Sequence, residues 1–161
     1  MVQFGAFRGD VISIQNFGSG EFGAGCTKMI ALQNEEGMHV NFVLTPGTFV
    51  VDQEMFRVGD TVTGYYDANA PAIAIYPPQY AALVMVKEHA NQQVKVSRFN
   101  RALISEDNQL QLNLRRSTPI VTTNGQAFTG RLFNRDLIVI YGPSTKSIPA
   151  QTTPYRVIVL C

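Results

Sequence analysis

Cysteine is scarce in this sequence, because Cys26 and Cys161 are the only two cysteines among 161 residues. A disulfide framework requires several cysteine pairs, and a structural zinc site requires a set of cysteine or histidine ligands. Two cysteines are too few for either arrangement. We therefore expect two buried thiols that act as small apolar side chains, with a disulfide between Cys26 and Cys161 as the alternative.

Long hydrophobic runs are also missing. The longest apolar stretch, residues 80–86, is far shorter than the roughly 20 residues of a membrane-spanning helix. The first residues lack the basic start and apolar run of a signal peptide. A hydrophobic content of 45% and a mean hydropathy of +0.02 predict a soluble protein with a packed core and no membrane partner. We expect it in the cytoplasm, or at the cell surface if a leader has been removed.

Motifs for catalysis and metal binding are absent from the sequence. His39 and His89 show no H-x-H or H-E-x-x-H spacing, so we interpret them as surface residues rather than metal ligands. No G-x-S-x-G or Cys–His signature supplies a nucleophile with a base. Glu35 and Glu36 occupy an expected turn, where acidic side chains are ordinarily solvated. The sequence thus predicts a protein that is not an enzyme, with no catalytic residue, metal site or cofactor.

One glycine-rich segment formally matches a cofactor motif. Residues 18–23 read GSGEFG, which fits G-x-G-x-x-G. A dinucleotide site needs a helix directly after the glycines, so that the helix N-terminus faces the pyrophosphate. Here residues 27–32 run into a hairpin turn, which leaves no room for such a helix. We expect a connection between two strands, with a role as a binding loop left open.

Alternating apolar and polar residues dominate the rest of the chain. Val40, Phe42 and Leu44 alternate with other residues after a hairpin signal at residues 34–37. A similar alternation recurs at residues 110–114, again after a turn. A period of two residues is typical of half-buried strands, so the sequence predicts an all-β fold.

Two segments of the chain resemble each other. The stretch GDTVTGYYDANAPAIAIYPPQYAALVMV aligns without a gap with NRDLIVIYGPSTKSIPAQTTPYRVIVLC. The alignment places Tyr66 on Tyr141, Ile73 on Ile148, Tyr80 on Tyr155 and Val84 on Val159. A repeat indicates the number of domains, and the structure expected for one copy can be checked against the sequence of the other. We expect the paired tyrosines to fill the cores of two domains, residues 1–89 and residues 93–161.

Each domain is expected to have about five strands in about 70 to 85 residues. Small sheets leave edges exposed unless they close, so we expect two tandem five-stranded OB-like barrels. An SH3-like barrel and one merged sandwich are the alternatives. A barrel of about 70 residues has marginal stability, so we expect the two barrels to pack on each other.

Three connecting segments refine this fold. Asp52 is expected to cap a single helical turn in the first domain. The Asn-Gly dipeptide at residues 124–125 predicts a hairpin turn at the corresponding place in the second domain. Residues 81–93 have some helical character, but their counterpart, residues 155–160, is β-branched. We therefore expect a strand over residues 80–87.

Turn and loop residues carry a resemblance to a family. The elements in the first copy are Gly59-Asp60, Tyr65-Tyr66 and Pro77-Pro78-Gln79, and the second copy keeps Tyr141 and Ile148-Pro149-Ala150-Gln151 but has Asn134-Arg135 for Gly-Asp. Over most of its length the chain resembles a family of tandem small β-barrel, OB-like proteins from Gram-positive anaerobes such as clostridia. Because these motifs are turn and core signatures, the resemblance implies a fold and a source and implies no activity.

Charge is distributed unevenly along the chain. The net charge is +1, but residues 1–88 carry four basic and nine acidic residues, and residues 89–161 carry nine basic and three acidic residues. The two parts thus have net charges of −5 and +6. This asymmetry favours attraction between the parts, within one chain or in a head-to-tail homo-oligomer, or a basic surface for an anionic partner.

Six arginines of the second domain form a candidate anion-binding set. They are Arg98, Arg101, Arg115, Arg116, Arg131 and Arg135. OB folds bind single-stranded nucleic acid or oligosaccharide across strands two and three. Such binding also needs aromatic side chains, and Phe99 and Phe133 neighbour arginines in the sequence. A net charge of +1 is weak for a nucleic-acid-binding protein, so the alternative is attraction to the acidic domain.

A candidate ligand loop lies in the first domain. Tyr65, Tyr76, Pro77 and Pro78 lie in or beside a long loop that could hold a sugar or a peptide. The structural alternative is that the tyrosines shared by both copies fill the core while the prolines stiffen the loop.

Taken with the charges, the sequence predicts a non-catalytic interaction or assembly module. A binding module for single-stranded nucleic acid or oligosaccharide is the alternative.

Overall fold

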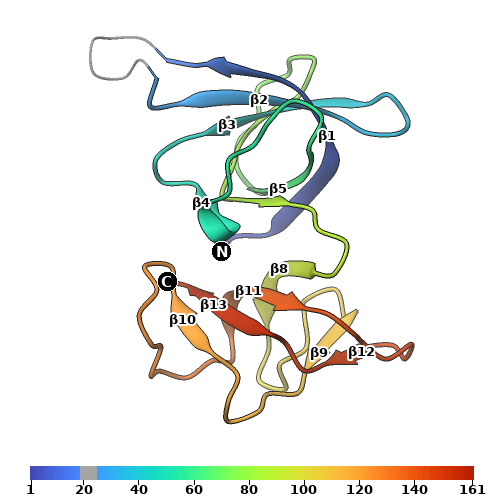
Figure 1. Ribbon diagram of the computed structural model, residues 1–161, viewed down its shortest axis with the longest axis vertical. Coiled ribbons are helices and arrows are strands. Elements are labelled where there is room, and N and C mark those ends of the chain that lie inside the picture. The colour runs from blue at the N-terminus through green and yellow to red at the C-terminus, as the bar shows by residue number, and fades with distance from the viewer. Residues whose placement is uncertain (19–24) are drawn as a thin grey trace. The chain divides into compact units, whose positions relative to one another are not determined.

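The computed structural model describes residues 1–18 and 25–161 as two compact units, Met1–Glu88 (unit 1) and His89–Cys161 (unit 2) (Figure 1). Among the described residues, every regular element is a β-strand except for a single 3-10 turn, Val51–Gln53. The all-β fold predicted from the alternation of residues is therefore confirmed.

Unit 1 is built on one mixed sheet. Its strands are β1 (Phe4–Asn16), β2 (Lys28–Gln33), β3 (His39–Leu44), β4 (Phe49–Val50), β5 (Thr61–Asp67), β6 (Gln79–Ala81) and β7 (Val84–Lys87). They are hydrogen-bonded in the order β4-β7-β5-β1-β2-β3-β6, and only the pairs β3–β6 and β4–β7 are parallel. Two residues, Ala82 and Leu83, separate β6 from β7. One extended stretch of chain therefore supplies β6 at one end of the strand order and β7 next to the other end.

Unit 2 contains a four-stranded sheet and a separate strand pair. Its strands are β8 (Gln93–Phe99), β9 (Leu110–Leu112), β10 (Ile120–Thr122), β11 (Arg135–Tyr141), β12 (Ala150–Thr152) and β13 (Arg156–Leu160). The sheet has the order β10-β13-β11-β8, with β10 and β13 parallel, and β9 pairs in parallel with β12. Isolated bridges join Phe99 to Ser105 and Ile104 to Gln111.

The expected closed barrels are not found among the described strands. The last stretch of each unit is broken into two short strands, and each half pairs in parallel with a different partner. The sheets are consequently mixed, with parallel pairs in both units, and the described strands do not form closed barrels.

The core of unit 1 surrounds Phe42, which is fully buried in β3. Val40 is buried on the same face, as the alternation predicts. Tyr66 and Tyr80 stack with 3.8 Å between ring centroids and pack, partly buried, against this core. Gly64 in β5 faces the Phe42 ring, and a Cβ atom there would lie 2.6 Å from ring carbons. The close approach of β5 to Phe42 therefore requires glycine.

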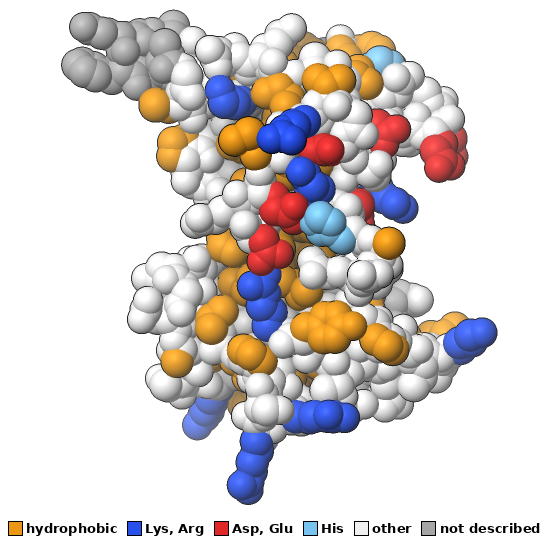
Figure 2. Space-filling view, viewed as in Figure 1, with side chains coloured by type: hydrophobic (Ala, Val, Ile, Leu, Met, Phe, Trp, Pro, Cys, Tyr) orange, Lys and Arg blue, Asp and Glu red, His pale blue; other side chains and the backbone are white. Residues whose placement is uncertain are grey.

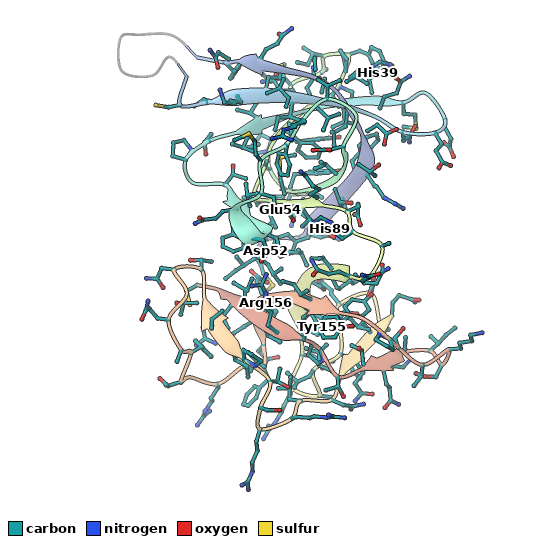
Figure 3. All side chains as sticks on the ribbon, in the orientation of Figure 1. His39, Asp52, Glu54, His89, Tyr155 and Arg156 are labelled. Atoms are coloured by element: carbon teal, nitrogen blue, oxygen red, sulfur yellow. The ribbon has the colours of Figure 1, made fainter. Side chains whose placement is uncertain are left out.

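The core of unit 2 includes Phe99, Leu137 and Val159, with Tyr141 packed against it. Tyr155 does not belong to this core, because it is 53% exposed and lies between β12 and β13 (Figure 3). The prediction that Tyr155 fills the core is therefore wrong.

The error arises from aligning loops of different length without a gap. Leu83 donates its amide hydrogen to the Tyr65 carbonyl at 2.8 Å, and Tyr155 donates to the Ile140 carbonyl at 2.8 Å. Tyr65 and Ile140 directly precede the matched tyrosines of β5 and β11. By this hydrogen bond Tyr155 corresponds to Leu83 and not to Tyr80, which lies three residues before Leu83. The loop that precedes Tyr155 in unit 2 is shorter than the matching loop in unit 1.

Two of the three expected connecting segments are confirmed. At residues 124–125 a turn forms in which Gly125 has φ of +83° and donates to the Thr122 carbonyl at 3.0 Å. Residues 80–87 are extended, as β6 and β7 with a short break. Asp52 is not a cap, because it lies inside the 3-10 turn with φ of +60° and the turn has no side-chain cap.

The prediction of buried thiols is wrong. Cys26 and Cys161 are both exposed, and no disulfide joins these two described residues. Cys26 lies in a turn before β2, and Cys161 follows β13 at the end of the chain. Neither position is on the inward face of a strand, which explains why neither thiol is buried.

Replacing Gly64 should test the packing of unit 1. We expect Gly64→Ala to lower the free energy of unfolding by about 1–3 kcal/mol, because the added methyl group overpacks the site beside Phe42. Gly47→Ala is the matched control, since the nearest atom to a Cβ there is Thr45 Oγ1 at 3.6 Å. Urea unfolding of the two variants measures the effect, and equal stabilities would contradict the packing described.

Candidate functional site

The best-formed candidate site lies on the loop between β10 and β11 and on the end of β8 beside it. Phe99 pairs with Arg135 across β8 and β11, and the Asn134 amide donates to the Phe99 carbonyl at 2.8 Å. This pairing brings the residues after β8 beside the residues before β11. The guanidinium carbon of Arg101 accordingly lies 5.8 Å from the ring centroid of Phe133.

A second arginine lies over a second ring of the same loop. The guanidinium carbon of Arg135 is 4.9 Å from the ring centroid of Phe128, and its Nε donates to the Arg131 carbonyl at 2.6 Å. Gly130 permits this arrangement, because a Cβ there would lie 2.8 Å from the Phe128 ring. The Phe128 amide donates to the Ile120 carbonyl at 2.9 Å, which anchors the loop to β10.

We call the set of these aromatic and basic side chains the Arg–Phe cluster. Its members are Arg101, Phe128, Arg131, Phe133 and Arg135. Arg101 and Arg131 are exposed, and the other three are half-buried. A cation over an aromatic face contributes about 0.5–1 kcal/mol at an exposed site, which is enough to favour one orientation of the guanidinium plane.

The six predicted arginines therefore separate into three groups. Arg101, Arg131 and Arg135 belong to the cluster. Arg98 instead forms an ion pair with Asp136, with 3.9 Å between Nη1 and Oδ1. The remaining two, at residues 115–116, are exposed in the turn before β10. On the face shown in Figure 2, the basic side chains of unit 2 stand apart from one another rather than forming one dense patch.

Sequence reasoning missed Phe128 as part of this site. Phe128 and Arg135 are separated by a loop without regular structure, so no periodic pattern brings them together. The available signal was the density of arginines and phenylalanines between residues 128 and 135. Phe99, which was expected to lie beside the arginines, is fully buried in the core instead.

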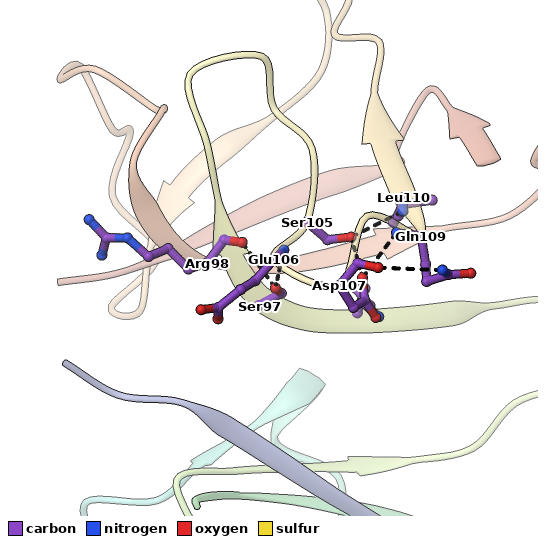
Figure 4. Close-up of polar contacts among 8 residues, drawn as sticks. Ser97, Arg98, Ser105, Glu106, Asp107, Gln109 and Leu110 are labelled. Atoms are coloured by element: carbon purple, nitrogen blue, oxygen red, sulfur yellow. Dashed lines mark hydrogen bonds and ion pairs between the residues drawn. The ribbon is translucent and has the colours of Figure 1, made fainter. Parts of the chain in front are cut away.

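The turn between β8 and β9 uses its carboxylate for structure. Asp107 accepts hydrogen bonds from Ser105 Oγ at 2.6 Å and the Gln109 amide at 3.1 Å, and it is paired with Lys95 Nζ (Figure 4). Burial raises the pKa of Asp107, but the hydrogen bonds from Lys95 and Ser105 lower it more, so that the net shift is downward. Leu110 donates to Ser105 Oγ at 3.0 Å, which completes the turn.

Asp136 has the opposite environment. Its Oδ1 is buried and makes no hydrogen bond among the residues that the structure describes. Burial raises the pKa of this carboxyl group, attraction to Arg98 offsets part of the rise, and repulsion by Glu106 adds to it. Its ionised form is therefore unfavourable in the folded state.

The two tyrosines of the candidate ligand loop of unit 1 lie in different environments. Tyr65 is 9% exposed within β5, which is paired on both sides, whereas Tyr76 is 79% exposed. Pro77 and Pro78 are half-buried between Tyr76 and β6. Tyr65 is therefore buried in a strand while Tyr76 is exposed in the loop, and their joint role in a ligand site stays a prediction.

Unit 1 has an open polar pocket that the sequence did not indicate. Its volume is about 370 Å³, and it is lined by Arg8, Gly9, Asp10, Gln33, Asn34, Glu35, Glu36 and Thr61. Thr61 Oγ1 donates to Asp10 Oδ1 at 2.7 Å, which occupies one carboxylate oxygen. The pocket lies where β1 pairs with β2 and β5, next to an irregularity between Val11 and Ser13. None of the described residues that line this pocket is aromatic.

The histidines of the chain do not come together as metal ligands would. His39 is half-buried in β3 and His89 is exposed at the start of unit 2 (Figure 3). Within residues 1–18 and 25–161, no three His, Cys, Asp or Glu side chains are grouped so that they could hold an ion. The glycine motif falls on residues 19–23, outside the described residues, except for Gly18.

Comparison with known proteins adds no family. Neither a family model nor a curated protein matches this sequence. Over the described part of the chain, no helix has the length and apolar character needed to cross a membrane.

Replacing each of the two aspartates of unit 2 by asparagine should change the stability of the chain in opposite directions. A raised folded-state pKa means that ionised Asp136 opposes folding above its unfolded pKa, so we expect Asp136→Asn to stabilise the chain at pH 7. This gain in stability should disappear as the pH falls below about 4, where the carboxyl group is protonated in both the folded and the unfolded state.

The lowered pKa of Asp107 has the opposite consequence, so we expect Asp107→Asn to destabilise the chain at pH 7.

Urea unfolding at pH 7 and at about pH 3 measures both effects. Loss of stability in Asp136→Asn at pH 7 would contradict the unfavourable burial of this carboxylate.

Proposed function

We propose that this chain is a non-catalytic interaction module, built from two copies of one OB-like β-topology, that associates with other copies of itself through opposite charge. Support for duplication comes from the strand pairings. In unit 1 the order β4-β7-β5-β1 has a parallel pair at its outer end, and β10-β13-β11-β8 has the same pattern in unit 2. The pairs β3–β6 and β9–β12 are also both parallel.

Local hydrogen bonds support the same proposal. Before β5, Gly59 has φ of +98° and donates to the Val11 carbonyl at 2.9 Å. Before β11, Asn134 has φ of +58° and donates to the Phe99 carbonyl at 2.8 Å. These are the two turns that the sequence comparison matched. The resemblance to tandem small β-barrel proteins of Gram-positive anaerobes rests on such turns, and it remains a proposal.

The observation that carries the functional proposal is the charge of the two units. Unit 1 spans residues 1–88 with a net charge of −5, and unit 2 spans residues 89–161 with a net charge of +6. Glu35 and Glu36 are exposed on the β2–β3 turn, and Arg115 and Arg116 are exposed before β10. Figure 2 shows the acidic side chains of its face on unit 1. Unlike surfaces on one chain favour a head-to-tail contact between chains.

A second function is favoured by a separate observation. The Arg–Phe cluster combines guanidinium groups with aromatic rings, which is the combination used to bind single-stranded nucleic acid. We keep binding of single-stranded nucleic acid or oligosaccharide by unit 2 as the alternative function.

Self-association should depend on salt and on complementary charges. We expect the apparent mass in sedimentation to rise with protein concentration at about 20 mM salt and to return to that of a single chain at about 500 mM salt, because salt screens exposed charges. Reversal of Glu35 and Glu36 to lysine, or of Arg115 and Arg116 to glutamate, should each weaken the association. Combining both reversals should restore it.

The control variant is Lys146→Glu, which changes a charge of unit 2 outside the proposed contact. A single-chain mass at every concentration in low salt would contradict the proposed self-association. So would equal effects of Lys146→Glu and of the arginine reversals.

A further inference from the structure

We infer that the Arg–Phe cluster is a binding site for single-stranded nucleic acid, in which bases stack on the planes of Arg101 and Arg135 while Arg131 pairs with a phosphate. This inference deepens the alternative function proposed for unit 2 and does not depend on self-association. It assigns separate roles to arginines that the sequence treats as one set.

The first argument is the position of two guanidinium groups over aromatic rings. Arg101 lies over Phe133 and Arg135 lies over Phe128, at 5.8 and 4.9 Å from the ring centroids. Each guanidinium carbon therefore lies over a phenyl ring, and each pair offers a cation and an aromatic ring to a planar ligand. Nucleic-acid bases stack on aromatic side chains and on arginine planes in this way.

The second argument is that the side chain of Arg135 is ordered before a ligand binds. The Nε hydrogen bond from Arg135 to the Arg131 carbonyl, at 2.6 Å, fixes the side chain along the loop. The loop itself is anchored where Phe128 donates to the Ile120 carbonyl and Gln126 donates to Thr122 Oγ1 at 3.2 Å. Ordering a long side chain opposes binding, so a side chain that is already ordered binds with a smaller entropic cost.

The third argument is electrostatic. No aspartate or glutamate occurs between Asp107 and Asp136 in the sequence. Within the described residues of unit 2, Asp107 forms an ion pair with Lys95, and Asp136 forms an ion pair with Arg98. No ion pair among the described residues involves the three arginines of the cluster. A guanidinium group without a carboxylate presents donors that match a phosphate.

A single strand fits these features better than a duplex or a sulfated glycan. A duplex hides the faces of its bases in its own stack, whereas the cluster offers planes for exposed faces. A sulfated glycan would pair with the arginines but has no flat ring for the planes of Arg101 and Arg135. Dependence of binding on the two phenylalanines therefore separates a single strand from other polyanions.

The experiment uses the full chain and fluorescence anisotropy. The probes are a fluorescein-labelled single-stranded DNA of mixed sequence, an RNA of the same sequence and the matching DNA duplex, each about 20 nucleotides long, which exceeds the site of one small binding domain. Heparin serves as the competing polyanion. We expect both single strands to bind more tightly than the duplex, with affinity that falls as salt increases.

The variants separate stacking from charge. We expect Arg101→Ala, and Arg135→Lys, which keeps the charge, each to weaken binding of the single strands by about tenfold. Phe128→Leu with Phe133→Leu should weaken binding to a similar extent without changing its dependence on salt. Arg115→Ala and Arg116→Ala remove the same charge outside the cluster and should change affinity by less than about threefold. Thermal unfolding of each variant identifies any that is not folded.

Two outcomes would overturn the inference. One is equal weakening by all arginine-to-alanine variants with no effect of the phenylalanine double variant, which would indicate attraction by charge alone. The other is duplex or heparin binding as tight as that of the single strand. Charge reversal at residues 115–116 alters self-association in the sedimentation experiment and leaves the cluster intact. Failure of one proposal is therefore distinguishable from failure of the other.

Discussion

Each unit depends on the backbone hydrogen bonds of its last extended stretch, because that stretch joins strands that are otherwise far apart in the sheet order. In unit 1 the amide of Ala82 donates to the Val43 carbonyl at 3.0 Å, and the amide of Leu83 donates to the Tyr65 carbonyl at 2.8 Å. β6 and β7, on either side, add parallel pairs with β3 and β4. Without this stretch the edges of a small sheet would have unpaired backbone groups.

This constraint leaves the connecting loops free to differ between the units. The loop between β10 and β11 carries the Arg–Phe cluster, whereas the corresponding connection in unit 1 contains the 3-10 turn at Val51–Gln53. The β2–β3 turn carries Glu35 and Glu36, while the corresponding turn of unit 2 uses Asp107 internally. Similar strand pairings therefore carry different loops, and the two units have net charges of opposite sign, acidic in unit 1 and basic in unit 2.

Much of the fold was predictable, because it follows from local patterns. Alternation indicated the buried face of β3 with Val40 and Phe42, and the turns expected before β5 and β11 form, with positive φ at Gly59 and Asn134. The parallel pairs were not predictable, since β6 and β12 are three-residue strands whose partners are distant in sequence. For the candidate site, the arginines were identified, but their contacts with Phe128 depend on the path of an irregular loop.

The central claim is that exposed opposite charges on the two units bring separate chains together. Two-dimensional amide NMR of the isotope-labelled chain, recorded over a range of concentrations at low salt, tests it most directly. We predict that resonances at residues 34–37 and 115–118 shift together as concentration rises, and that added salt reverses the shifts. Spectra that do not change with concentration, or shifts confined to residues away from both charged turns, would contradict the claim.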